Sequence, residues 1–311
     1  MRKIYFITVI IIILFAVNIF LAVTNSRNAM SLVSSAGIKD DYEGRAYILP
    51  IAGPNYMPIL DSNIPRPEIS AKSAVVYDTR SGRFLYDKES NKRLPVASLT
   101  KILSAVITIE NLNLDDIVTI SEQSLKVDGE KQDLYLGERM TVRNLLKLML
   151  IESSNDAAYA LAAHAKSLEA DFVSLMNLKT ISLGMADSFF ADPAGLDDSG
   201  YSTAQDLVKL TEYSLKYREI WDISSEKTAI VESSDERIKH KAISTNRLLG
   251  LVNDIIGGKT GYTEGAGQCM ILVTSVSGYS GKLISVVLGS DDRFGDTQKL
   301  IEWAREAYRW K

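Results

Sequence analysis

The chain carries, at residues 95–101, the stretch Pro95-Val96-Ala97-Ser98-Leu99-Thr100-Lys101. A mostly apolar run follows it, and this run predicts a buried helix over residues 102–107. Because a hydroxyl residue is a favoured helix cap, we expect Ser98 at the helix N-terminus. Ser98 and Lys101 are then one turn apart on the same face. A capping serine beside a surface lysine would give the same pattern, so companion motifs must decide.

The chemistry of this pair depends on the protonation of the lysine. A serine hydroxyl becomes a strong nucleophile only when a base takes its proton, and lysine can do so only as the neutral amine. Burial and the positive end of the helix dipole both disfavour an ammonium ion, and the like charge of Lys259 would add to them. The pattern therefore makes Ser98 a candidate nucleophile and Lys101 a candidate base.

Composition excludes several classes of protein. The 311 residues are 46% hydrophobic and 24% charged, as in an ordinary globular protein. With a net charge of −4 and no basic tract, a nucleic-acid partner is not expected. His164 and His240 lie far apart in the sequence, so we expect no histidine-rich metal site and no cofactor. Cys269 cannot form an intramolecular disulfide, and its apolar strand favours packing over nucleophilic chemistry.

The N-terminus predicts export. Arg2 and Lys3 precede residues 4–23, an uncharged run whose 20 residues would span about 30 Å as a helix. The positive flank predicts a cytoplasmic N-terminus with the remainder outside. The run is long for a signal peptide and no clear cleavage site follows, which favours an anchor, although a cleaved signal stays open. Residues 1–26 are thus expected to hold the protein at the membrane, or to direct its secretion if they are removed.

A proline-rich tether is predicted over residues 27–69. The stretch is polar, shows no sustained period, and holds most of the prolines of the chain. The alternative that part of it packs onto the domain stays open, because residues 57–60 are apolar. The five prolines are Pro50, Pro54, Pro58, Pro65 and Pro67.

Residues 70–311 are expected to form the folded domain, of the α+β class. Strands at both ends with helices between them predict an antiparallel sheet backed by helices, plus a mainly helical subdomain. The N- and C-terminal segments would share the sheet. Strands are expected at 74–77, 83–86, 118–120, 257–262, 268–275 and 282–289, and helices from Ser98 onward and at 141–151, 154–165, 170–183, 203–217 and 296–310.

Two further motifs accompany the first. Ser153-Ser154-Asn155 lies at a predicted helix junction, and Lys259-Thr260-Gly261 lies in a predicted strand. The motifs follow each other at intervals of 55 and 106 residues. Ser-x-x-Lys, Ser-x-Asn and Lys-Thr-Gly in this order are typical of β-lactamases and penicillin-binding proteins. Each motif is weak alone, but the ordered set is a strong joint signal.

Over residues 70–311 the sequence resembles the D-alanyl-D-alanine carboxypeptidases, the low-molecular-mass penicillin-binding proteins. The family often has glycine where Ser154 stands here. The resemblance implies a transpeptidase-like fold shared with β-lactamases, peptidoglycan stem peptides as substrates, and β-lactams as covalent inhibitors. Further matching segments are 94–101, 153–158, 195–197, 202–204, 245–248, 259–263, 287–289 and 293–294.

The resemblance also assigns the reacting groups. Ser98 would attack the terminal peptide bond of a stem pentapeptide, form an acyl-enzyme and release D-alanine. Lys101 would take the proton of Ser98, and Ser153 would relay a proton to the leaving amine. Asn155 would orient Lys101 and bind the substrate amide.

The third motif would hold the peptide. By resemblance, the Lys259 strand pairs with an extended substrate, and Gly261 allows close approach. The oxyanion hole would consist of the backbone N–H groups of Ser98 and Tyr262. Thr260 and Arg293 would bind the terminal carboxylate, which would favour carboxypeptidase over endopeptidase action. Arg293 could instead pair with the neighbouring residues Asp291, Asp292 or Asp296.

Two other functions compete with this one. A class A β-lactamase needs a glutamate some tens of residues after the second motif, and none lies between Glu169 and Glu212. Slow deacylation, and hence trapping of penicillin, is therefore expected. The second alternative is a non-catalytic module that binds peptidoglycan, which the complete set of polar residues disfavours.

Overall fold

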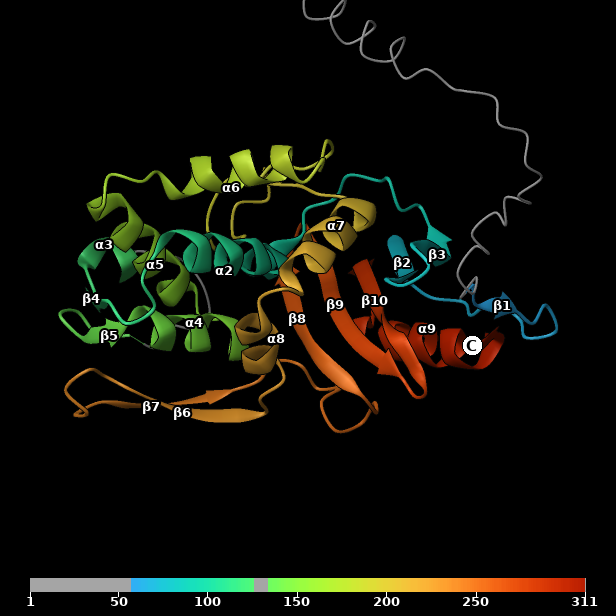
Figure 1. The fold of residues 1–311 in the computed structure, drawn as a ribbon. Coiled ribbons are helices and arrows are strands. Elements are labelled where there is room, and N and C mark those ends of the chain that lie inside the picture. Colours follow the sequence, from blue (N-terminus) through green and yellow to red (C-terminus); the bar gives the residue numbers. More distant parts are fainter. Residues whose placement is uncertain (1–56, 126–133, 311) are drawn as a thin grey trace, which may run out of the picture. The chain divides into compact units, whose positions relative to one another are not determined.

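A five-stranded antiparallel sheet joins the two ends of the described chain. The computed structural model describes residues 57–125 and 134–310. The strand order is β3-β2-β10-β9-β8, with all neighbours antiparallel, so segments from both ends share one sheet as predicted. β8 is the outermost strand on one side (Figure 1). The strands are β2 (Ser73–Asp78), β3 (Arg83–Lys88), β8 (Ile255–Thr263), β9 (Gly267–Val276) and β10 (Tyr279–Ser290).

Helix α9 (Arg293–Ala307) covers one face of this sheet (Figure 1). Leu300 and Ile301 are fully buried in a core that α9 shares with the strands. The chain leaves the helix before the expected end and forms β11 (Tyr308–Arg309), which pairs with β1 (Ile59–Leu60). Ordered packing therefore begins before residue 70, so the apolar residues at the end of the predicted tether lie on the domain.

The other face of the sheet meets a helical region built around α2 (Thr100–Asn111). The first nine residues of α2 are buried, since other helices surround it (Figure 1). Thr141, Ser154 and Thr203 cap three of the helices, each accepting a backbone N–H with its hydroxyl. The surrounding helices are α4 (Val142–Ile151), α5 (Asn155–Ser167), α6 (Phe172–Ser182), α7 (Ala204–Ser214) and α8 (Arg218–Ser224).

A hairpin that the sequence pattern did not predict packs along α4 (Figure 1). It consists of β6 (Thr228–Glu232) and β7 (Lys239–Ile243). His240 of β7 is buried, and its Nε2 lies 2.6 Å from the Glu138 carboxylate. This contact ties the hairpin to the small sheet of β4 (Ile117–Thr119) and β5 (Arg139–Thr141). In the chain, β4 precedes α3 (Glu122–Leu125), and β5 precedes α4.

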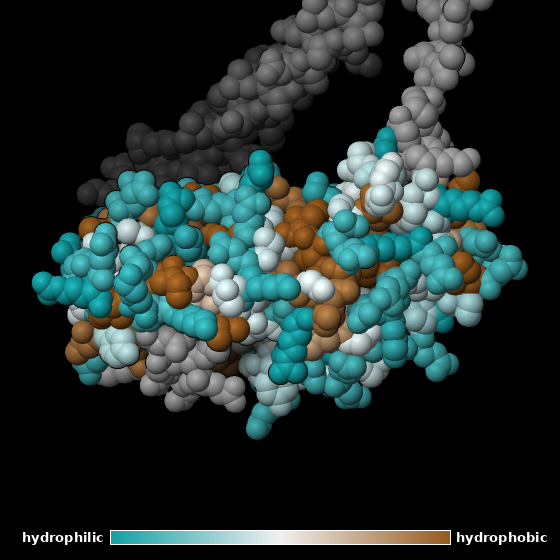
Figure 2. Space-filling view, turned by 90° about the horizontal axis from the view of Figure 1, so that it is seen from below, coloured by the Kyte–Doolittle hydropathy of each residue, from teal (hydrophilic) through white to brown (hydrophobic). Residues whose placement is uncertain are grey.

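The face seen from below is mostly hydrophilic, with hydrophobic residues gathered near its middle (Figure 2). Among the described residues, no helix has the length and apolar character needed to cross a bilayer. The predicted membrane segment at residues 1–26 and most of the predicted tether lie outside the described residues.

Candidate active site

Ser98 lies in a tight turn and does not cap a helix. The turn is the 3-10 segment η1 (Ala97–Leu99), and the helix begins afterwards with Leu99 as its N-cap and no side-chain cap. The prediction of a serine cap was therefore wrong. The chain enters the helix through backbone hydrogen bonds from Thr100 to the carbonyls of Ala97 and Ser98, which leaves the Ser98 hydroxyl available for Lys101.

Two glycines allow neighbouring segments to pack closely against this turn. Gly195 has a φ of 76°, and a Cβ at this position would overlap the Ala97 carbonyl. On the other side, a Cβ at Gly261 of β8 would lie 3.0 Å from the backbone nitrogen of Ser98. The turn that contains Ser98 is thus fixed between the edge strand β8 and a loop that precedes α7.

Lys101 is fully buried, and its Nζ has three partners. These are Ser98 Oγ at 2.8 Å, Asn155 Oδ1 at 2.7 Å and the Ala194 carbonyl at 2.9 Å. The amide and carbonyl oxygens can only accept, so they take the two hydrogens of a neutral amine. The lone pair then faces Ser98, the one partner of the three that has a proton to give.

Burial is what makes the neutral amine accessible. It lowers the pKa of Lys101 to about 7, against a weaker opposing effect of the Asp192 carboxylate. We expected the charge of Lys259 to contribute, but desolvation is the main cause. Lys101 can therefore act as a base near neutral pH.

A second serine–lysine pair lies beside the first. Lys259 Nζ donates to Ser153 Oγ at 2.8 Å and to the Thr260 carbonyl at 2.8 Å. Ser153 has a φ of 70° and directly precedes the cap of α5, which is Ser154. The second serine is thus held by the lysine of the strand, and its own hydroxyl hydrogen remains to be donated.

These groups surround one cleft of about 370 Å³. Seven of the nine predicted site residues line it, and the two buried lysines contact it through Ser98 and Ser153. The structure therefore brings together residues from three distant segments. The cleft is lined by Ser98, Glu152, Ser153, Asn155, Leu196, Thr245, Thr260, Gly261, Tyr262, Thr263, Glu264 and Arg293.

One end of the cleft carries hydroxyl and guanidinium groups. Thr260 Oγ1 lies 2.6 Å from Thr245 Oγ1, and Arg293 Nη1 donates to the Gly261 carbonyl at 2.7 Å. Burial lowers the pKa of Arg293, but the group remains a cation at physiological pH. Within the described part of the chain, Arg293 forms no ion pair with the nearby aspartates. Asp296, for example, accepts hydrogen bonds from Ser70 and Ser290 instead.

Sequence reasoning assigned no role to three residues that complete the site. Thr245 belongs to a matched segment, but nothing in the pattern predicts its contact with Thr260. Ala194 contributes only a backbone carbonyl, which leaves no trace in the sequence. Asp192 shapes the turn that contains Ala194, and Gly195-Leu196-Asp197 was the one signal that this turn matters.

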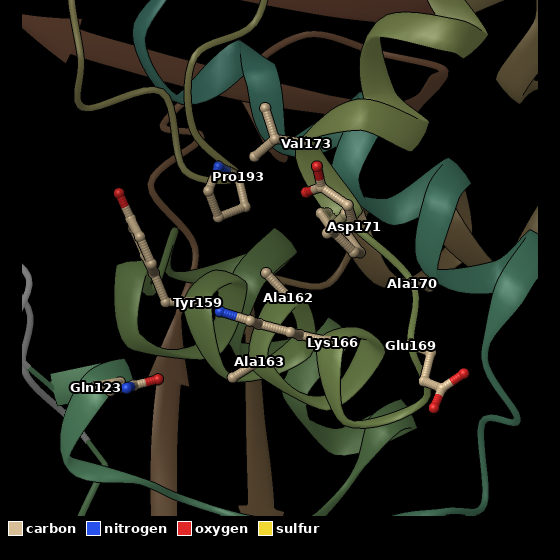
Figure 3. Close-up of a pocket in the computed structure, with 11 residues that line it drawn as sticks. Gln123, Tyr159, Ala162, Ala163, Lys166, Glu169, Ala170, Asp171, Val173 and Pro193 are labelled. Carbon is tan, nitrogen blue, oxygen red and sulfur yellow. The ribbon is translucent and has the colours of Figure 1, made fainter.

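A larger hollow of about 600 Å³ lies among α3, α5 and the start of α6 (Figure 3). None of the residues that line it is a predicted site residue, and its walls are mainly alanine and other apolar side chains. Tyr159 and Pro193 form one wall, so the hollow lies against the same turn that supplies Ala194 to Lys101 (Figure 3). Volume alone does not indicate the chemical site here.

Metal and thiol chemistry find no support in the described residues. No group of three or more His, Cys, Asp and Glu side chains there could hold a metal ion. Cys269 is buried in β9, and burial raises the pKa of its thiol to about 11. A thiolate nucleophile is therefore unfavourable at this position.

Comparisons with known proteins agree on one family. The D-alanyl-D-alanine carboxypeptidase family matches residues 61–292 of this chain. The D-alanyl-D-alanine carboxypeptidase DacF of Bacillus subtilis is 34% identical over 76% of this chain and 63% of its own length. A D-alanyl-D-alanine endopeptidase of Pseudomonas aeruginosa is 30% identical over 76% of this chain and 77% of its own. Penicillin-binding protein D2 of Listeria monocytogenes, solved with ampicillin bound, is 31% identical with a TM-score of 0.68, covering 77% of this chain and 99% of that one.

Proposed function

This chain belongs to the D-alanyl-D-alanine carboxypeptidase family, and we propose that it removes the terminal D-alanine from peptidoglycan stem pentapeptides through an acyl-enzyme on Ser98. The observation that carries the proposal is the environment of Lys101. Two pure acceptors bind its hydrogens, and burial lowers its pKa to about 7, so that its lone pair is directed at the Ser98 hydroxyl.

The reaction proceeds in two steps. The Ser98 oxygen bonds to the carbonyl carbon while its proton passes to Lys101 Nζ, and the peptide C–N bond then breaks. The leaving D-alanine needs a proton, and the Ser153 hydroxyl, polarised by the Lys259 ammonium at 2.8 Å, is placed to donate it. Lys101 restores the proton of Ser153. In the second step, Lys101 takes a proton from a water molecule whose oxygen bonds to the ester carbonyl carbon. The bond from this carbon to the Ser98 oxygen breaks, and Lys101 returns the proton to Ser98.

The substrate is held by β8 and by the polar end of the cleft. As the outermost strand of the sheet, β8 can pair with an extended peptide. The N–H groups of Ser98 and Tyr262 would bind the developing oxyanion, each contributing about 3 kcal/mol. Thr260 and Arg293 would bind a terminal carboxylate, a contact that an internal peptide bond does not offer.

This contact bears on the choice between two activities in the family. Relatives include both carboxypeptidases and endopeptidases, of which the Pseudomonas aeruginosa protein is an example. The cationic end of the cleft favours the carboxypeptidase.

We also propose that β-lactams acylate Ser98 and leave slowly. Residues 1–26 would direct the domain to the outer side of the membrane.

Release of D-alanine from a pentapeptide stem mimic tests the proposal. The wild-type protein should release one D-alanine per peptide and cleave a crosslinked dimer poorly, whereas Ser98→Ala should release none. Equal activity of Ser98→Ala and wild type would refute Ser98 as nucleophile. Faster cleavage of the dimer would assign the endopeptidase activity instead.

A further inference from the structure

One buried carboxylate organises the turn next to Lys101. Asp192 is 8% exposed, and its Oδ1 accepts from the backbone N–H groups of Ala194 at 2.6 Å and Gly195 at 2.7 Å. Its Oδ2 accepts from those of Leu196 at 2.9 Å and Asp197 at 2.8 Å. The Tyr159 hydroxyl lies near the same carboxylate, whose charge adds to burial in raising the pKa of the phenol. Every partner is a donor, so both oxygens act as acceptors, as in an ionised carboxylate.

The folded turn contacts Lys101 and the residue that precedes Ser98. The Ala194 carbonyl accepts from Lys101 Nζ at 2.9 Å, and Gly195 packs against the carbonyl of Ala97, next to Ser98. Without the Ala194 acceptor, the amine of Lys101 would be free to rotate its lone pair away from Ser98. The shape of this turn therefore determines the direction of the Lys101 lone pair.

The carboxylate also acts through its charge. The charged residues on the elements around the amine include Asp192 and Asp197 in the turn, Asp156 on α5 and Lys259 on β8. Ser98 and Asn155, which contact the amine, are neutral. Burial lowers the pKa of Lys101, and Asp192 is the group whose charge opposes this. The two effects together give the amine a pKa of about 7.

We propose that Asp192 is a positioning residue for Lys101. The Asp192 carboxylate folds the 192–197 turn against the amine, and its charge raises the pH above which the amine can accept the Ser98 proton. The inference rests on the proposed function, because it assumes that Lys101 is the base for Ser98.

The test is the pH dependence of acylation by a fluorescent penicillin, measured from pH 5 to 9. Asp192→Asn removes a negative charge, which destabilises the ammonium, so the acid limb should move to lower pH and the plateau should fall. The rate at pH 5.5 divided by the plateau rate should rise roughly threefold, as for a change of about half a pH unit. Asp197→Asn is the matched control, because that carboxylate lies in the same turn and caps Ser199. It should leave the limb in place.

A second variant keeps the test decisive if Asp192→Asn does not fold. Tyr159→Phe removes the polar hydroxyl near the Asp192 carboxylate and leaves its charge less screened, so the acid limb should move slightly to higher pH. The inference alone is overturned if folded Asp192→Asn leaves the acid limb unmoved, or if Asp197→Asn shifts it equally. Where Asp192→Asn does not fold, an unmoved limb in Tyr159→Phe overturns it. No acylation of the wild type at any pH overturns the proposed function, and this inference with it.

Discussion

Two serine–lysine pairs share one cleft, yet they are built differently. On the helical side, Lys101 lies three residues from Ser98 and is bound by a side-chain amide and a loop carbonyl. On the sheet side, Lys259 lies 106 residues from Ser153 and also binds a carbonyl of its own strand. Both pairs have the same 2.8 Å separation. What distinguishes the first amine is its set of partners: two acceptor oxygens bind it besides its serine, and burial lowers its pKa to about 7, as a base requires.

The largest effect should follow from removing the base. Lys101→Met keeps the length of the side chain without its amine, so the Ser98 proton has no acceptor. We expect the rate of acylation by penicillin to fall by about 10⁴-fold or more. Stopped-flow or gel-based acylation kinetics measure this. A loss smaller than tenfold would mean that another group takes the proton.

The matched change on the sheet side should cost less. Lys259→Met removes a donor to Ser153 and a positive charge in the cleft, while Ser98 and Lys101 keep their contacts. Acylation should fall by about 10²- to 10³-fold, the usual loss for one electrostatic contact in a reacting site. If both lysine variants lose the same activity, the difference drawn between the two pairs does not hold.

Alanine substitution at two glycines distinguishes the effect of packing against the Ser98 turn from the effect of backbone strain. Gly195→Ala introduces a Cβ that overlaps the Ala97 carbonyl at a φ of 76°. Displacement of the Ser98 turn should lower acylation by about 10²-fold. Gly184→Ala has a similar φ of 66° but meets no atom within 4 Å, so it is the control. It should cost about 1 kcal/mol of stability and leave acylation unchanged. Equal acylation by the two variants would contradict the packing argument.

The smallest effect is expected at the end of the cleft where Thr260 and Arg293 would bind the substrate carboxylate. Thr245→Val removes the hydroxyl that lies 2.6 Å from Thr260 Oγ1. The kcat/KM for a pentapeptide mimic should fall about fivefold, close to 1 kcal/mol for one hydrogen bond. Thr245→Ser restores the hydroxyl and should recover most of the loss. Failure of the serine variant to recover would point to packing of the methyl group instead.

Local features of the fold could be predicted because they depend on local chemistry. The sheet strands and most helices follow from the hydrophobic pattern of the sequence. The hairpin of β6 and β7 was missed, since each strand is short and alternates weakly. Ser98 was misassigned as a cap because a 3-10 turn before a helix has no distinct pattern.

The site, like the fold, has parts that could be predicted from the sequence and parts that could not. Ser98, Lys101 and their companions could be named from motifs, because side-chain identity is what the motifs record. The Ala194 carbonyl could not, because a backbone acceptor is set by the path of the chain. The dominance of burial over the charge of Lys259 also required the fold, since desolvation depends on everything packed around the amine.

The most direct test of the account is the rate of covalent acylation by a labelled penicillin as a function of pH, with the adduct mapped by mass spectrometry. Lys101 is protonated below its pKa of about 7 and neutral above it, so the rate should rise with pH and level off, with a midpoint near 7. The adduct should lie on Ser98. An adduct elsewhere, or a rate that still climbs toward pH 10 as for an ordinary lysine, would contradict the account.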